Sequence, residues 1–135
     1  MANKWFIDTG AYFARFYKRD QYHLNSVNLW NRLENEAIIT ITTNHVLDEL
    51  ATLLARRTSY DFSSRKLGKI YNSDIRIERP SEKDELKALE FFRKYADQKI
   101  SFTDCLSFVV MHKLWISQVF TFDKHFEYAG FEIIS

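Results

Sequence analysis

Short apolar segments alternate with helical patterns along the whole chain, and this alternation limits the fold more than any other feature. The segments are rich in β-branched and aromatic residues and are three to five residues long, too short for buried helices. Continuous apolar strands separated by helices are typical of a parallel sheet that is covered on both faces. We expect strands at residues 4–7, 37–41, 75–77, 118–122 and 131–134.

The stretches between these strands carry helical spacing or helix-start signals. We expect helices over residues 24–33, 46–57, 62–71, 81–95, 102–115 and 124–128. The sequence therefore predicts an α/β domain of three layers. Its central, mostly parallel sheet has about four to five strands, with helices on both faces.

Length and composition define the class of protein. The chain has 135 residues, which fits a single domain over residues 1–135, and 46% of them are hydrophobic. With 19 basic against 18 acidic residues, any nucleic-acid binding has to come from a local patch. The one cysteine excludes a disulfide framework, and three glycines leave no phosphate-binding loop. No apolar run reaches the roughly 18 residues of a membrane span, so we expect a cytoplasmic protein without membrane contact.

Two carboxylates follow predicted strands directly. Asp8 comes after the first strand and Asp123 after the strand at 118–122. Ligands of such sheets bind beyond the carboxyl ends of the strands, so both are candidate site residues. Either residue also fits the plainer role of a turn or helix cap.

Two further acids stand out on predicted helices. Asp104 lies in the first turn of a helix that is apolar nearly all round, where a carboxylate is costly unless it is paired, hydrogen-bonded or metal-bound. The helix N-terminus, with Ser101 or Thr103 as cap, is the alternative explanation. Glu49 lies on the flank of the apolar stripe of its helix, whereas Asp48 points to solvent. Glu49 equally fits a boundary residue that pairs with a neighbour.

Asp8, Glu49, Asp104 and Asp123 can converge on one crevice. Carboxylates that close raise one another's pKa unless a cation neutralises them. Oxygen ligands without a Cys or His cluster favour Mg²⁺ or Mn²⁺. One or two such ions support hydrolysis of a phosphodiester bond.

Four short motifs carry a resemblance to a known family. Together they resemble the acidic motifs of the PIN domain in the same order, and the chain's end is similar to that family's last strand. A stand-alone domain of this size resembles the VapC-type toxins. The motifs are residues 6–9, 46–50, 102–104 and 119–126, with the ending at 129–134.

The resemblance implies a metal-dependent endoribonuclease, the toxin of a type II toxin–antitoxin pair, that leaves 5′-phosphate and 3′-hydroxyl ends. It implies one or two Mg²⁺ or Mn²⁺ ions, a homodimer, and an antitoxin protein that inserts near the acidic site. The same four acids match the metal-binding acids of the family, while Thr9 and Thr121 are supporting residues. Lys124 and His125 stand where some members have a further acid or amide.

The densest basic stretch carries interleaved aromatic residues, an arrangement that suits an RNA backbone with unpaired bases. A solvated helix face is the alternative. His45, His112 and His125 lack mutual ligand spacing, and we interpret them as core or surface residues. The basic residues are Arg56, Arg57, Arg65, Lys66 and Lys69.

Two other classes of protein compete with the nuclease. The first is a catalytically silent module of the same fold that binds RNA or protein, against which the presence of all four acids counts. The second is a receiver-like signalling domain, which needs a phosphoacceptor Asp after a central strand. Residues 75–77 are followed instead by Glu78, Arg79 and Pro80, so we discount it.

Overall fold

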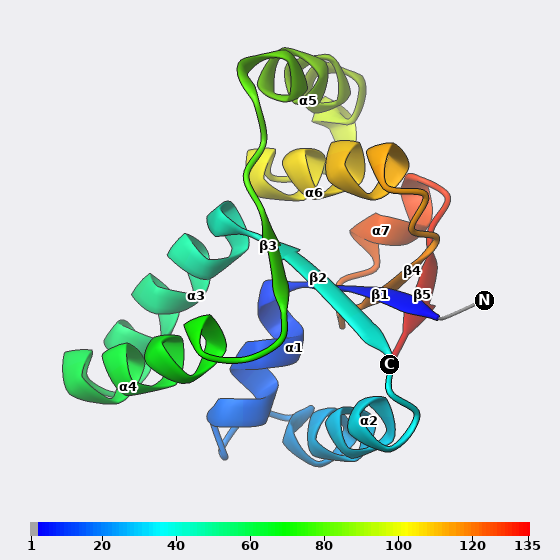
Figure 1. Ribbon diagram of the computed structural model, residues 1–135. Coiled ribbons are helices and arrows are strands. Elements are labelled where there is room, and N and C mark those ends of the chain that lie inside the picture. Colours follow the sequence, from blue (N-terminus) through cyan, green and yellow to red (C-terminus); the bar gives the residue numbers. More distant parts are fainter. Residues whose placement is uncertain (1–2) are drawn as a thin grey trace.

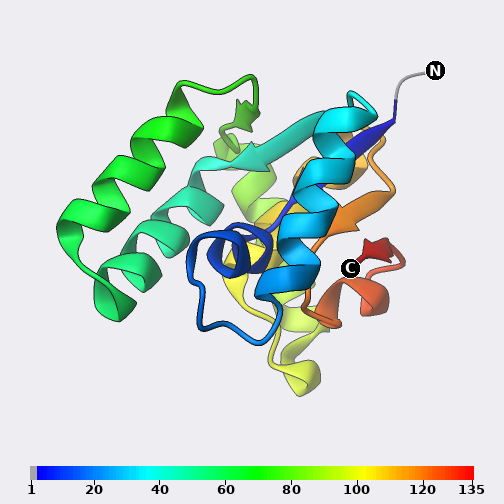
Figure 2. The same cartoon turned by 90° about the horizontal axis from the view of Figure 1, so that it is seen from below.

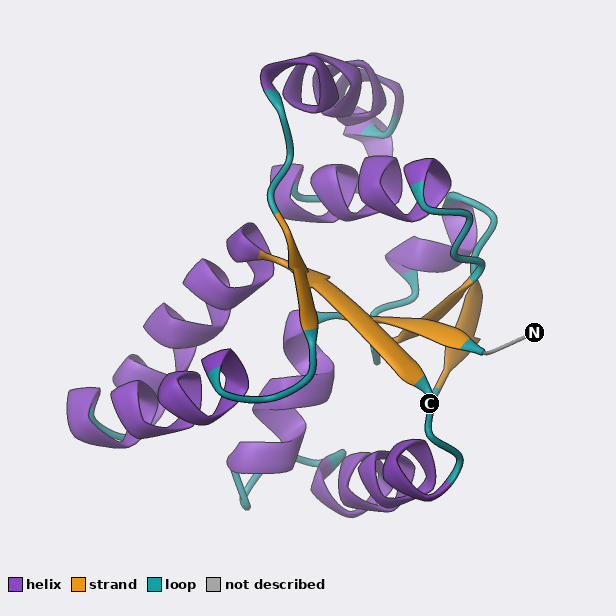
Figure 3. Ribbon diagram, in the orientation of Figure 1, coloured by secondary structure: helices purple, strands orange, loops and turns teal. Residues whose placement is uncertain are grey.

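The computed structural model describes residues 3–135. Within this range five strands form one parallel sheet in the order β3-β2-β1-β4-β5, as the alternating pattern predicts (Figure 1). Figure 3 shows this sheet in the middle of the domain with helices on both sides. The strands are β1 (Lys4–Ile7), β2 (Ile39–Thr43), β3 (Arg76–Glu78), β4 (Gln118–Phe120) and β5 (Glu132–Ile134).

The helices cover the two faces of the sheet separately. Helices α5, α6 and α7 lie on one side, whereas α1 and α2 lie on the other, with the hairpin of α3 and α4 beside α1 (Figures 1 and 2). The helices are α1 (Thr9–Phe16), α2 (His23–Asn35), α3 (Asn44–Arg57), α4 (Tyr60–Tyr71), α5 (Glu82–Lys94), α6 (Phe102–Lys113) and α7 (His125–Tyr128), with a short 3₁₀ turn η1 (Ala96–Gln98) before α6.

The alternation of side chains along β1 explains why two cores form. Phe6 packs under α6, while Trp5 and Ile7 point to the opposite face, toward α1 and α2. Each of the three is at most 1% exposed. Phe108 of α6 lies at the centre of the core on the α6 side of the sheet, where its ring contacts those of four other aromatic residues. The central strand β1, predicted from its apolar run, is thus buried on both faces.

Several element ends differ from the predicted ones, each for a local reason. Strand β2 begins at Ile39 because Ala37, with φ of 52°, turns the chain after α2. Helix α4 begins at Tyr60, since the Ser59 hydroxyl accepts a hydrogen bond from the Phe62 amide. Helix α6 ends at Lys113, two residues early, because the chain reverses at Trp115 with φ of 57°. Strand β4 ends at Phe120, which frees the following residues for the site described below.

Among residues 3–135, the helices are all too short or too polar to cross a lipid bilayer.

Candidate active site

Asp8 lies at the carboxyl end of the central strand β1 and is only 5% exposed. It occupies the N-cap position of α1, but its side chain forms no capping hydrogen bond within the described chain. Its Oδ2 accepts a hydrogen bond of 2.7 Å from the Thr121 hydroxyl at the end of the neighbouring strand β4. The carboxylate is therefore directed across the sheet edge toward the end of β4.

Asp104 approaches the same edge from the opposite layer. It lies in the first turn of α6, where Ser101 is the N-cap and its hydroxyl accepts the Asp104 amide at 3.1 Å. The capping role that the sequence offered for Ser101 is thus confirmed. The Asp104 residue is only 7% exposed, and its carboxylate Oδ2 lies 3.6 Å from the ring nitrogen Nδ1 of His125.

The remaining two acids complete the group from two more segments. Glu49, on α3, is exposed but contributes to the cavity through the flank of its helix, as the helical wheel suggests. Asp123 follows β4, and its Oδ1 accepts the His125 amide at 2.9 Å at the start of α7. The Asp123 side chain therefore also stabilises the turn before α7, which is the plainer role considered for it in the sequence.

One cavity of about 440 Å³ is lined by all four predicted acids. They reach it from β1, α3, α6 and the segment after β4. The cavity lies beyond the carboxyl ends of β1 and β4, where parallel sheets place their ligands. The structure thus brings the four carboxylates to one place, while their catalytic role stays a prediction.

The electrostatics of this cavity oppose full ionisation. Burial raises the pKa of Asp8 to about 7, against the lowering effect of the Thr121 hydrogen bond, and the charge of Glu49 raises it further. Burial likewise raises the pKa of Asp104 to about 8, with Asp8 and Asp123 as the next causes. A cation in the cavity would remove this repulsion and allow both carboxylates to ionise.

The two threonines predicted as supporting residues have different surroundings. Thr121 is fully buried; its hydroxyl donates to Asp8 and accepts the Asp123 amide at 3.0 Å, so it joins two of the acids. Thr9 lines the cavity, and its buried Oγ1 has no hydrogen-bond partner among residues 3–135. Buried hydroxyls are normally paired, so this oxygen is available to a bound ligand.

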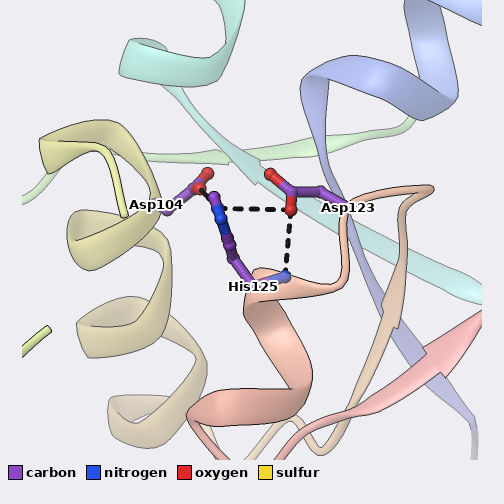
Figure 4. A group of neighbouring side chains, drawn as sticks. All are labelled: Asp104, Asp123 and His125. Atoms are coloured by element: carbon purple, nitrogen blue, oxygen red, sulfur yellow. Dashed lines mark hydrogen bonds and ion pairs between the residues drawn. The ribbon is translucent and has the colours of Figure 1, made fainter. Parts of the chain in front are cut away.

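Besides the four acids and the two threonines, the cavity has further lining residues that were not predicted from the sequence. His125, interpreted above as a core or surface residue, lies within ligand distance of Asp104 and Asp123 (Figure 4). Lys99 and Tyr22 also line the cavity. The sequence did carry one signal for His125. It lies two residues after Asp123 at the start of a predicted helix, and the turn there brings both side chains to the same cavity.

The predicted basic residues do not form one patch. Arg57, Lys66 and Lys69 line a separate cavity of about 1310 Å³ between α1, α2 and α4, which we call the basic groove. Arg56 instead lines a hollow of about 590 Å³ that borders the acidic cavity. Arg65 is exposed and pairs with Asp61 at 3.0 Å.

The basic groove combines positive charge with aromatic surface. The Lys66 ammonium lies 5.3 Å from the ring centre of Phe16 and 5.2 Å from that of Phe62. Burial lowers the pKa of Lys66, and the positive charge of Lys69 lowers it further. An anionic group in the groove would relieve this crowding of like charges.

Comparisons with known proteins identify the family. A family model described as the PIN domain matches residues 5–132. The chain belongs to the PIN domain family. Two curated relatives of this PIN protein are both named as VapC nucleases. The 23S rRNA-specific endonuclease VapC20 of Mycobacterium tuberculosis is 31% identical over 93% of this chain and 94% of its own. A VapC ribonuclease of Archaeoglobus fulgidus is 31% identical, over 89% of this chain and 77% of its own.

Solved structures show the same PIN fold. The crystal structure of M. tuberculosis VapC20, described as a sarcin–ricin loop cleaving toxin, matches with a TM-score of 0.85 at 30% identity. The match covers 93% of this chain and 95% of VapC20. VapBC2 of Rickettsia felis, solved with a promoter DNA fragment, matches with a TM-score of 0.69 at 16% identity, which is a likeness of fold alone.

Proposed function

We propose that this chain is a VapC-type endoribonuclease that hydrolyses RNA phosphodiester bonds and leaves 5′-phosphate and 3′-hydroxyl ends. The observation that carries the proposal is the single cavity lined by Asp8, Glu49, Asp104 and Asp123. The names of the VapC relatives, which cover almost the whole chain, support the same activity.

The residues present fit a divalent cation. The four carboxylates offer the hard oxygen ligands that Mg²⁺ and Mn²⁺ prefer, and we propose that they hold one or two such ions. The raised pKa values of Asp8 and Asp104 and the unpaired Thr9 hydroxyl support a cationic ligand in the cavity. These carboxylates would hold the ion, and the ion would supply polarisation of the scissile phosphate and a lowered pKa of an attacking water.

The protein's own contribution is to fix the carboxylates in place. The Thr121 hydroxyl donates a buried hydrogen bond to Asp8 and accepts one from the Asp123 amide, so it positions both residues. At the N-terminus of α6 the Ser101 hydroxyl accepts a hydrogen bond from the Asp104 amide, which fixes the backbone of Asp104. Lys99 adds a positive charge at the wall of the cavity, where we place a non-bridging oxygen of the bound phosphate.

An aromatic pair supports a single-stranded substrate. The rings of Tyr22 and Phe122 stack with centres 4.5 Å apart and planes 2° from parallel, and both residues line the acidic cavity. Tyr22 is partly exposed, so its outer face is open to an unpaired base next to the scissile phosphate. Unstacked bases of this kind occur in loops and single strands rather than in duplex RNA.

We propose that the basic residues bind the RNA backbone at two positions, one next to the scissile phosphate and one farther from it. Arg56 borders the acidic cavity and contacts a phosphate beside the scissile one, whereas Arg57, Lys66 and Lys69 hold the backbone in the basic groove. Replacing both Lys66 and Lys69 by Ala should flatten the salt dependence of RNA binding by about 1.4 in log–log slope, or about 0.7 for each lost contact. An unchanged slope would assign the basic groove to a protein partner.

We also propose the cellular setting that goes with a VapC toxin: a cytoplasmic homodimer, of a single domain per chain, neutralised by a cognate antitoxin that covers the acidic cavity. The description of the VapC20 relative as a toxin supports this proposal. Co-expression with the neighbouring gene, followed by size measurement of the purified complex, tests it.

Cleavage of 23S rRNA by the purified chain tests the proposed activity, since the M. tuberculosis relative carries that substrate in its name. We expect discrete fragments with Mn²⁺, loss of cleavage with EDTA, and no fragments from Asp8→Asn, which removes a charge at nearly constant shape. Wild-type rates from Asp8→Asn would refute the nuclease site. If neither cleavage nor Mn²⁺ binding is seen, the silent binding module is the better description.

A further inference from the structure

The ring of His125 points into the acidic cavity from the first turn of α7. Its Nδ1 lies 3.2 Å from Asp123 Oδ1 and 3.6 Å from Asp104 Oδ2 (Figure 4). Two layers of the fold meet here, because Asp104 belongs to α6 and the other two residues belong to the segment after β4. The contact therefore depends on the tertiary fold and not on sequence proximity alone.

The Nδ1 atom of His125 is buried, and both of these contacts are to carboxylate oxygens. Although it is close to two carboxylate oxygens, it forms no hydrogen bond within residues 3–135. The backbone amide of His125, not its ring, makes the hydrogen bond to Asp123. A buried polar atom without a partner costs free energy, so a nitrogen held in this way indicates a partner that binds later.

The spacing of the three side chains suits one metal ion. Each offers one ligand atom within 4.8 Å of those of the other two. With metal–ligand distances of about 2.1 Å, neighbouring ligands of an octahedral ion are about 3 Å apart and opposite ligands about 4.2 Å apart. Both measured contacts of Nδ1 lie between these values, so small adjustments bring all three atoms onto one ion.

We propose that His125 Nδ1 is a direct ligand of the divalent ion held by Asp104 and Asp123, and that this nitrogen makes the site prefer Mn²⁺ to Mg²⁺. The inference rests on the proposed function only for the presence of the ion. Mg²⁺ favours all-oxygen shells and keeps its waters, whereas imidazole is a good ligand for first-row transition metals. His125 thus replaces a carboxylate or water oxygen with a donor that discriminates between the two ions.

Pulsed electron paramagnetic resonance of Mn²⁺ bound to the full chain, without RNA, tests the ligand directly. We expect ¹⁴N coupling in the wild-type spectrum and its loss in His125→Gln. His45→Gln is the matched control, because His45 borders Glu49 in the adjoining hollow but lies outside the cluster. That variant should keep the coupling.

Calorimetric titration measures the predicted preference. We expect His125→Gln to weaken Mn²⁺ binding on the order of tenfold or more, with a smaller effect on Mg²⁺. Equal weakening of both ions, or Mn²⁺ bound to the wild type without ¹⁴N coupling, would overturn the proposal. So would an absence of Mn²⁺ binding. The wild-type spectrum does not depend on how a variant folds, and thermal melting in EDTA checks the variants.

The RNA assay separates this inference from the proposed function. Cleavage by a wild-type chain whose Mn²⁺ shows no ¹⁴N coupling would leave the nuclease in place and remove His125 from the metal shell. Coupling without cleavage of any RNA would keep the ligand and refute the nuclease.

Discussion

Removing the charge of Asp104 should stabilise the metal-free protein at alkaline pH. The residue is 7% exposed, and burial together with Asp8 and Asp123 raises its pKa from 3.8 to about 8. A group whose folded pKa is raised binds a proton more tightly in the folded state, so stability falls as the pH rises from about 4 to about 8. Asp104→Asn abolishes this loss because the amide carries no charge.

The size of the effect follows from the pKa. One pKa unit corresponds to about 1.4 kcal/mol, so a rise from 3.8 to about 8 corresponds to roughly 6 kcal/mol at most. In the wild type Asp8, whose pKa is also raised, to about 7, takes up a proton in place of Asp104 and so relieves part of the repulsion. We therefore expect Asp104→Asn to raise the free energy of unfolding by about 2 to 3 kcal/mol at pH 8, and by less than about 1 kcal/mol at pH 4.5.

Urea unfolding in EDTA at the two pH values measures this difference. Asp97→Asn is the control, because Asp97 is exposed in the 3₁₀ turn η1 and its replacement should change stability by no more than about 0.5 kcal/mol. Saturating Mn²⁺ should reverse the order at pH 8, since it stabilises only the chain that binds it well. An Asp104→Asn chain that is less stable than the wild type at pH 8 in EDTA would refute the electrostatic account.

Three further substitutions probe the support of the site and the core. Thr121→Val should lower metal affinity and cleavage by about 10- to 100-fold, because it removes the hydrogen bond that holds Asp8. Thr121→Ser should keep most of the affinity and of the cleavage rate. Metal titration and initial cleavage rates measure the two effects. Asp84→Ala should cost about 1 to 2 kcal/mol at pH 7, since it breaks the capping box of α5 and the ion pair with Lys113. The pKa of Asp84 is lowered, chiefly by hydrogen bonding to the Ser81 backbone. Unfolding at decreasing pH should therefore show the full cost above about pH 3.8 and a decreasing cost as the pH falls from 3.8 through the lowered pKa of the folded state. Phe108→Ala should cost about 3 to 5 kcal/mol in urea unfolding, and a loss under 1 kcal/mol would contradict the aromatic core described for α6.

The fold could be predicted because its signals are local. The apolar runs at residues 4–7 and 131–134 need only their own residue types to indicate strands, and the all-parallel order follows from the helices between them. Element ends were less predictable. The left-handed turns at Ala37 and Trp115 occur at residues with no preference for positive φ, so the sequence carried no signal for them.

The acids of the site could be found for different reasons. Asp104 is conspicuous as a single carboxylate on an apolar helix, and Asp8 and Asp123 lie at strand ends, so patterns within single elements were enough. His125 was missed because ligand spacing was sought among histidines, whereas its partners are carboxylates, one of them on another layer of the fold. The division of the basic stretch between the basic groove and the hollow beside Glu49 also depends on how α3 and α4 pack, which no periodicity reveals.

The central claim is that four carboxylates from four segments form one metal-dependent nuclease centre. The most direct test is single-turnover cleavage of one mapped RNA by the wild type and by Asp8→Asn, Glu49→Gln, Asp104→Asn and Asp123→Asn, at saturating Mn²⁺ and with folding checked in EDTA. We expect each variant to lose at least about two orders of magnitude in cleavage rate, because the four groups act as a unit. Wild-type rates in any one folded variant would remove that acid from the centre, and wild-type rates in all four would contradict the claim.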